Sequence, residues 1–346
     1  MDKPGMIVCF GEALIDMLAQ PPATPDAPRA FLQFAGGAPA NVSVAVARLG
    51  GDSHFVGMLG DDMFGDFLLR SLQEAGVATG GVARTGEART ALAFVALDEH
   101  GERSFSFYRP PAADLLFRAA HFDRLGFDGT AIFHVCSNSM TGAEIAQTTF
   151  EGMRGARAAG AAVSFDMNLR PMLWPRGTDP APRLWQALAL ADVVKLSREE
   201  FDWLRGASGS DGAAVIERLW RGGAQLLLVT DGDRPLRWHT RGAAGEVPAF
   251  RVQVQDTTAA GDAFVGGLLY QLARRLGGGM ALETFCADRT AIGARHRPAC
   301  RRRGRCAGSD PPGCLRRDAA ARRRAFPDRG AAVMPGDERR EWGSRC

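Results

Sequence analysis

Short apolar segments alternate with amphipathic segments along most of this chain, and this alternation is the feature that most limits its fold. Apolar runs of strand length lie at residues 6–10, 53–60, 131–137, 161–168, 191–197 and 224–232. Segments with helical spacing of apolar residues lie among them, at residues 38–50, 62–76, 143–160, 198–206 and 212–223. Such regular alternation predicts an α/β fold with a mostly parallel central sheet that is covered by helices.

One segment interrupts this alternation. Residues 89–110, "RTALAFVALDEHGERSFSFYRP", contain two stretches of alternating apolar and polar residues around the turn "DEHGE". This pattern predicts a β-hairpin inserted in the α/β body. Because ligands of open α/β sheets bind at the carboxyl ends of the strands, we expect the hairpin to act as a small β lid over such a site.

The C-terminal part of the chain has a different charge from the rest. Residues 286–346 contain 16 Arg against 7 acidic residues, a net charge of +9, whereas residues 1–285 contain 26 basic against 32 acidic residues, a net charge of −6. The basic part loses both the strand and the helix periods. We therefore expect a folded body at residues 1–285, and an atypical tail at residues 286–346 that is disordered or read out of frame. A basic nucleic-acid-binding arm is the alternative, but no binding motif supports it.

The compartment is predicted from the cysteines and from the N-terminus. Cys9 and Cys136 are the two thiols of the body, and well-separated thiols are typical of a reducing compartment. The sequence "MDKPGMIVCFGEALID" lacks the pattern of a signal peptide, and no apolar stretch reaches 18 residues. We expect a cytoplasmic protein that binds neither membranes nor nucleic acids.

The lysine content excludes two classes of nucleotide-binding protein. The chain has only Lys3 and Lys195, and neither lies in a P-loop or in a protein-kinase motif. The glycines of "FAGGAPANVS" do not form a dinucleotide-binding fingerprint either. If the protein handles phosphate, it must use helix N-terminal amides, arginine and a metal ion.

The stretch "VQDTTAAGDAFVGGLL", residues 254–269, places Asp262 where a helix begins. Helix N-termini carry unpaired N–H groups and bind anions such as phosphate. An aspartate there is either an ordinary N-terminal carboxylate or, beside a bound anion, a general base.

Six motifs in order carry a family resemblance. They are "GEALID", "FAGGAPANVSVAVARLG", "DMNLRPMLW", "KLSREE", "LLLVTDG" and "DTTAAGDAFVGGLL". In order and spacing they resemble the PfkB/ribokinase-like carbohydrate kinases, and "FYRPPAADLLF" and "FDMNLRPMLW" are most similar to the fructokinase branch. The resemblance implies a three-layer α/β/α sandwich with a small β-sheet lid, built in part from residues 13–35 and 88–110. It also implies transfer of the ATP γ-phosphoryl group to a sugar hydroxyl.

The resemblance assigns the catalytic step to the start of the last motif. Asp262 would accept the proton of the sugar hydroxyl. Ala259, Ala260 and Gly261 would present backbone N–H groups to the transferring phosphoryl, which requires small side chains. With the other motifs present, the base role of Asp262 is favoured over simple capping.

Sugar recognition would involve two groups of residues. Asp16 and Asn41 would bind hydroxyls, while Gly36 and Gly37 would let the sugar ring approach the backbone. A helix-start turn is the alternative interpretation of these glycines.

The second group lies later in the chain. Tyr108 and Arg109 end the expected hairpin and would close over the sugar, although Arg109 could equally be a solvated surface residue. Asn168 and Arg170 follow a predicted strand, and Arg170 would contact phosphate or substrate.

The nucleotide and metal side would involve Ser197, Glu200, Thr230 and Gly232. Glu200 would bind Mg²⁺ through water, and Ser197 replaces the asparagine usual in the family. Thr230 and Gly232 would lie against ATP, and K⁺ is a further candidate cofactor. The alternatives are a first-turn helix carboxylate for Glu200 and a strand-ending turn for Thr230 and Gly232.

Two departures from the family pattern affect the expected activity. Ala259 occupies a position that is usually glycine, and if the position needs a positive φ the Cβ costs about 1 kcal/mol. The tail replaces the elements that would complete the nucleotide pocket.

The sequence thus predicts an ATP-dependent sugar kinase that phosphorylates fructose, with a homodimer through the lid as an expected assembly. The alternatives are a 2-keto-3-deoxygluconate kinase and a catalytically weak sugar-binding protein.

Overall fold

The computed structural model describes residues 5–20, 24, 26, 28–97, 103–109, 111–249 and 259–287. The chain divides into units at residues 1–316 and 317–346, and every described residue lies in the first. The predictions for the basic tail therefore lie outside the described residues, apart from Cys286 and Ala287.

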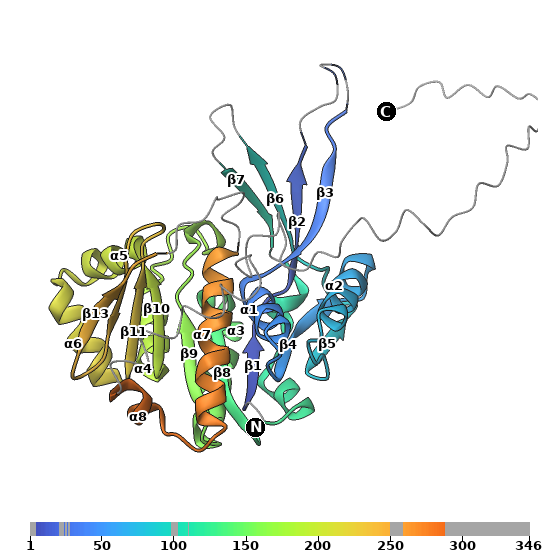
Figure 1. The fold of residues 1–346 in the computed structure, drawn as a ribbon. Helices are drawn as coiled ribbons and strands as arrows, with labels where there is room; N and C mark the ends of the chain where they lie inside the picture. Colours follow the sequence, from blue (N-terminus) through green and yellow to red (C-terminus); the bar gives the residue numbers. More distant parts are fainter. Residues whose placement is uncertain are drawn as a thin grey trace, which may run out of the picture. The chain divides into compact units, whose positions relative to one another are not determined.

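The main sheet has nine strands in the order β13-β12-β11-β10-β9-β8-β1-β4-β5 (Figure 1). They are β1 Met6–Phe10, β4 Ser53–Gly60, β5 Val82–Thr85, β8 Thr130–Cys136, β9 Ala162–Asp166, β10 Val193–Ser197, β11 Leu226–Thr230, β12 Leu236–His239 and β13 Ala244–Val247. The strands from β11 to β5 pair in parallel, while β12 and β13 are antiparallel additions at one edge. The predicted mostly parallel sheet is confirmed, and all six expected strands are present.

Both faces of this sheet are covered by helices. One face packs against α3 Ala143–Ala158, α4 Ala181–Leu190, α5 Arg198–Ser208 and α6 Gly212–Gly222, and the other packs against α1 Ala38–Arg48, α7 Ala260–Leu276 and α8 Leu282–Ala287. Strand β1 shows why this works, since Val8 and Phe10 join the first core and Ile7 and Cys9 join the second. Alternate residues of one strand are thus buried on opposite faces, as expected of a parallel sheet.

A second, four-stranded sheet has the order β3-β2-β6-β7. Its strands are β2 Leu14–Ala19, β3 Phe31–Gly36, β6 Leu92–Leu97 and β7 Arg103–Tyr108. The last two form the predicted hairpin, with Leu92 opposite Tyr108. Helix α2, Met63–Glu74, packs beside the main sheet, where Asp62 caps it by accepting from the N–H groups of Phe64 and Gly65.

Helices α1 and α7 pack closely against each other on the second face of the main sheet (Figure 1). Gly266 of α7 makes this possible, because a Cβ at this residue would lie 2.5 Å from the Cβ of Ala45 on α1. The contact brings the first turns of the two helices together.

Candidate active site

Asp262 lies in the first turn of α7 and is only 9% exposed. The Nδ2 atom of Asn41, in the first turn of α1, donates to its Oδ2 atom over 2.9 Å. Two helix N-termini therefore meet at one carboxylate, which the sequence predicted as the base.

Burial raises the pKa of Asp262 to about 6, and the negative charge of Asp166 raises it as well. The Asn41 hydrogen bond and the positive charges of Lys195 and Arg170 act in the opposite direction. A carboxylate with a pKa close to neutral is ionised at pH 7 and still basic enough to accept a proton. These properties suit a general base better than a simple helix cap.

Ala259 precedes α7 with φ 57° and ψ 12°, in the left-handed region. Residue 259 therefore does have a positive φ, so the cost expected for an alanine Cβ at this position applies. The first intrahelical bond runs from the N–H of Ala263 to the carbonyl of Ala259. The N–H groups of Ala260, Gly261 and Asp262 precede that bond and form the helix end at which an anion would bind.

Asp16 lies on β2 close to Asp262. Burial of its carboxyl and the charge of Asp262 raise its pKa to about 7. The carboxyl rests directly on Gly36, where a Cβ would be 2.2 Å from Oδ2 of Asp16. Gly37 has φ 101°, and its Cβ would lie 2.5 Å from the carbonyl oxygen of Glu12. The two glycines thus leave room for contacts within the protein itself, which the sequence interpretation did not anticipate.

Tyr108 and Arg109 have different environments although they are adjacent. Tyr108 is 67% exposed, whereas Arg109 is 6% exposed. Nε and Nη2 of Arg109 donate to Oδ2 of Asp114 over 2.9 and 2.5 Å, and Nη2 also donates to the carbonyl of Asn138 over 2.9 Å. The interpretation of Arg109 as a solvated surface residue is therefore wrong.

The Arg109 pair is part of a larger buried group that sequence reasoning missed. Glu12 is 1% exposed and its Oε1 accepts from Nδ2 of Asn138 over 3.0 Å. Burial raises the pKa of Glu12, and the neighbouring Arg109 lowers it. This group joins the end of β7 to the loop after β1. Only the pairing across strands brings its members together, so no sequence spacing indicates it.

Asn168 and Arg170 follow β9, as predicted. Asn168 has φ 37°, a strained value for a residue with a side chain. Arg170 is exposed, and its positive charge lowers the pKa of Asp262. Arg170 therefore lies near the candidate base, where an anionic substrate group would bind.

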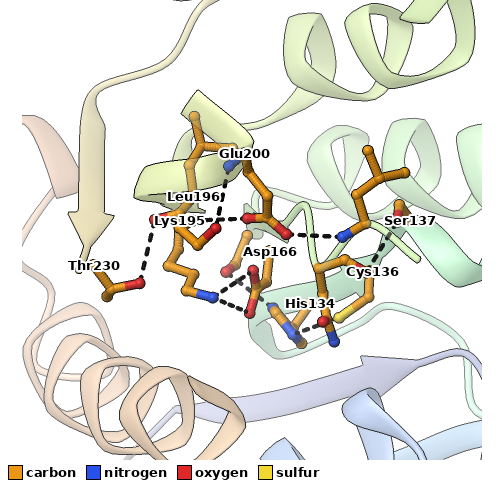
Figure 2. Close-up of polar contacts among 12 residues, drawn as sticks. His134, Cys136, Ser137, Asp166, Lys195, Leu196, Glu200 and Thr230 are labelled. Atoms are coloured by element: carbon orange, nitrogen blue, oxygen red, sulfur yellow. Dashed lines mark hydrogen bonds and ion pairs between the residues drawn. The ribbon is translucent and has the colours of Figure 1, made fainter. Parts of the chain in front are cut away.

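The four residues predicted for the nucleotide side gather where β10 and β11 end. Ser197 and Thr230 are partners across the two strands, and Gly232 follows with φ 57°. The Oγ atom of Ser197 caps α5 by accepting from the N–H of Glu200 over 3.2 Å. Figure 2 shows Glu200 and Thr230 in the same region as Lys195 and Asp166.

Both oxygens of the Glu200 carboxylate already accept hydrogen bonds from the backbone. Its Oε1 accepts from the N–H of Leu169 over 2.8 Å, and its Oε2 accepts from the N–H of Ser197 over 2.7 Å (Figure 2). No group of three His, Cys, Asp or Glu side chains able to hold a metal occurs within the described part of the chain. These residues do not fit a preformed magnesium site with Glu200 as a direct ligand. The first-turn carboxylate interpretation of Glu200 describes what is observed.

Two further buried residues, Asp166 and Lys195, were not predicted as site residues. Nζ of Lys195 donates to both carboxylate oxygens of Asp166, over 3.0 and 3.1 Å. They face α7 from the ends of β9 and β10. Each begins one of the six motifs, "DMNLRPMLW" and "KLSREE", and Lys195 is one of two lysines in the chain, but neither signal marked them as site residues.

A carboxylate at a helix N-terminus, at the carboxyl edge of a mostly parallel sheet and beside a small second sheet, is the arrangement that the resemblance to the sugar kinases implied. The chain matches the pfkB family carbohydrate kinase profile over residues 5–294. It belongs to this family.

The relatives place the chain in the fructokinase branch. It is 44% identical over 277 residues to fructokinase-1 of Zea mays, covering 78% of this chain and 83% of that protein. Among solved structures it is similar to a fructokinase with bound ATP from Xylella fastidiosa, with 66% identity, a TM-score of 0.79, and coverage of 83% of this chain and 87% of that one.

A fructokinase from Vibrio cholerae O395 in fructose, ADP and calcium ion bound form is also similar. Its identity is 35% and its TM-score 0.70, covering 79% of this chain and 85% of that one. The family, the branch and the fold predicted from the six motifs are confirmed. No helix in the ranges that the structure describes is long and apolar enough to cross a bilayer.

Proposed function

We propose that this protein is an ATP-dependent fructokinase that converts fructose to fructose 6-phosphate. The observation that carries the proposal is Asp262, buried at the N-terminus of α7 with a pKa of about 6 and hydrogen bonded to Asn41. The names and ligands of the relatives agree with it, since ATP, fructose and ADP are bound in the two similar fructokinases.

In this proposal Asp262 accepts the proton of the fructose hydroxyl while the hydroxyl oxygen forms a bond to the γ-phosphorus of ATP. The bond from that phosphorus to the ADP oxygen breaks, and ADP leaves. The N–H groups of Ala260 and Gly261 and the guanidinium of Arg170 offset the charge of the transferring phosphoryl. Asp16 and Asn41 would bind the sugar hydroxyls. Thr230 and Gly232 would lie against the nucleotide.

We keep Mg²⁺ and K⁺ as proposed cofactors. Mg²⁺ is usually held by substrate phosphates, several waters and one or two carboxylates. Since both oxygens of Glu200 accept backbone N–H groups, we propose that Glu200 would hold Mg²⁺ through water, where the ion would offset negative charge on the phosphates of ATP. A K⁺ ion is bound in one structure of the Vibrio fructokinase.

The structure favours a neutral sugar over 2-keto-3-deoxygluconate, the alternative substrate. A keto acid needs a cation for its carboxylate; the buried guanidinium of Arg109 is already paired with Asp114, and this proposal assigns the exposed guanidinium of Arg170 to the transferring phosphoryl. The other alternative, a catalytically weak sugar-binding protein, draws its support from the left-handed Ala259.

A coupled ADP-release assay across fructose, 2-keto-3-deoxygluconate and ribose tests the proposal. Fructose should react at least about ten times faster than either competitor, a difference of about 1.4 kcal/mol in transition-state binding. A faster reaction with the keto acid would make the chain a keto-acid kinase. Fructose binding with no ADP release from any sugar would leave the sugar-binding alternative.

We also propose a homodimer through the small sheet. Its edge strands are β3 and β7, and they carry Phe31, Leu32 and Tyr108, which are 40, 44 and 67% exposed. Phe94 stacks edge-on between Phe31 and Tyr108, so the apolar surface is continuous. Light scattering should give twice the monomer mass, and a change of Phe31 to Lys, within this aromatic row, should give the monomer.

Two further parts of the prediction stay proposals. Cys9 and Cys136 are free and buried, which agrees with a reducing cytoplasm. Residues 1–285 remain the proposed kinase domain, and the matched profile ends near there, at residue 294. Replacing residues 286–346 with a fructokinase-like C-terminus tests whether the tail limits nucleotide affinity, through the KM for ATP.

A further inference from the structure

A stripe of polar side chains lies on the face of the main sheet that α7 covers. The stripe consists of His134 and Cys136 on β8, Ser164 and Asp166 on β9, and Lys195 on β10. They are partners across neighbouring strands: His134 with Ser164, Cys136 with Asp166, and Asp166 with Lys195. The apolar residues of this face form the core that packs against α1, α7 and α8.

The stripe is closed by hydrogen bonds within itself (Figure 2). Nδ1 of His134 is 3.0 Å from Oγ of Ser164, and Sγ of Cys136 is 3.6 Å from Nε2 of His134. Burial and the charge of Lys195 lower the pKa of His134 to about 3, so this ring is neutral at working pH. The only charges in the stripe are those of Lys195 and Asp166.

This ion pair is deeply buried, with side-chain exposures of 10% for Lys195 and 1% for Asp166. Buried ion pairs rarely stabilise a fold compared with apolar residues of the same volume, because both ions lose their hydration. The position of the ion pair, rather than a contribution to stability, therefore indicates its function.

The ammonium group of Lys195 lies against the start of α7. A Cβ at Gly261 would be 3.4 Å from its Nζ atom. Gly261 is the residue before Asp262, so a buried positive charge lies directly below the helix end that would hold the phosphoryl group. Charges in such an enclosed place are poorly screened by solvent.

We infer that Lys195, held in place by Asp166, is a positioning residue for phosphoryl transfer that keeps Asp262 ionised at neutral pH. The inference rests on the proposed function, in which Asp262 is the base. A purely structural ion pair is the competing explanation, and it predicts no effect on the titration of Asp262.

The groups that face Asp262 come from five segments of the chain. Asp16 faces it from β2, Asp166 from β9, Lys195 from β10 and Arg170 from the loop after β9, while Asn41 of α1 donates to it. Among these groups, Lys195 lowers and Asp166 raises the pKa of Asp262. Removing one member of the pair should therefore move this pKa, and the two removals should move it in opposite directions.

The test measures the acid limb of the kcat profile at saturating fructose and ATP for the parent chain, K195M and D166N. In K195M the midpoint should rise by about one pH unit or more. The activity of this variant at pH 6 should then be about tenfold lower than its own activity at pH 8.5. In D166N, which keeps an amide oxygen for Lys195, the midpoint should fall. In the double variant D166N/K195M it should return to within about half a unit of the parent. The titration of ATP is common to all four proteins.

A matched control is D192N. Asp192 is also a buried carboxylate next to β10, but it precedes the strand, at the end opposite Lys195, where its Oδ2 accepts from the N–H of Val163 over 2.8 Å. D192N should leave the midpoint of the acid limb as it is in the parent chain. Equal midpoints in the parent, K195M and D166N would overturn the inference, even if all the rates were lower.

A second measurement does not depend on turnover. The ¹³C carboxyl resonance of Asp262, assigned by its loss in D262N, should give the same order of midpoints. If K195M does not fold, D166N alone decides, since the inference requires its midpoint to fall. If D262N keeps normal turnover the proposed function fails, whereas a loss of turnover in D262N with no shift in the other variants defeats only the inference.

Discussion

Changing Ala259 to glycine should stabilise this protein. Ala259 has φ 57° and ψ 12°, and a non-glycine residue in this region costs about 1–2 kcal/mol. The additional freedom of glycine in the unfolded chain offsets about 0.4–1 kcal/mol of that gain. The net increase in the free energy of unfolding should therefore be about 0.5–1 kcal/mol.

Urea unfolding followed by circular dichroism measures this change. With an m value of about 3 kcal/mol/M, the midpoint of A259G should rise by about 0.2–0.3 M while m stays constant. Ala263, four residues further along α7, has helical geometry and provides the control. A263G should lower the midpoint, since glycine inside a helix costs about 0.5–1 kcal/mol.

An unchanged or lower midpoint in A259G would refute the reasoning. It would mean that the left-handed backbone at residue 259 is not a source of strain in solution. A higher midpoint together with a higher kcat would show that the same strain also displaces the N–H groups at the start of α7.

Three other substitutions test the site. D262N should lower kcat by about 100-fold or more while fructose binding by calorimetry persists, and it should raise the free energy of unfolding by about 2 kcal/mol at pH 8 but not at pH 4. The gain appears at the higher pH because the pKa of Asp262 is raised in the folded chain, which therefore loses stability as pH rises from about 4 to about 6. G36A should raise the KM for fructose several-fold in steady-state assays, because the new Cβ would displace the carboxyl of Asp16; an unchanged KM would remove Asp16 from sugar binding. D114A should destabilise the chain by about 3–5 kcal/mol in urea, since it leaves the guanidinium of Arg109 buried and unpaired; a loss below about 1 kcal/mol would show that water reaches this group.

The central part of the fold could be predicted from the sequence because strand and helix periods are strong there. Helix α4 was not predicted although Ala181, Leu184, Trp185 and Leu188 have helical spacing, because Pro180 and Pro182 at its start are typical turn residues. Strands β5, β12 and β13 were also missed. Each has four residues, which is too short for an alternating pattern to stand out.

Motifs mark the residues of the candidate site, Asp166 and Lys195 included, but not which of them meet in the fold. Asp262 and Asn41 lie in two of the six motifs, and the packing of α1 on α7 brings them together. Asp166 and Lys195 are 29 residues apart and meet only through the register of β9 and β10. Nothing in a linear pattern specifies that register, so the pair could be found only in the structure.

The distance between α1 and α7 has a consequence for how tolerant the chemistry is to change. Gly266 sets this distance four residues beyond Asp262, where it touches no proposed substrate. A methyl group there would force the two helices apart, and the 2.9 Å bond between Asn41 and Asp262 would lengthen with them. The base would then lose its orientation although every group that binds sugar or nucleotide was still present. The alignment of the reacting atoms in this enzyme thus depends on Gly266, one helical turn from Asp262, where the interior has room only for a hydrogen atom.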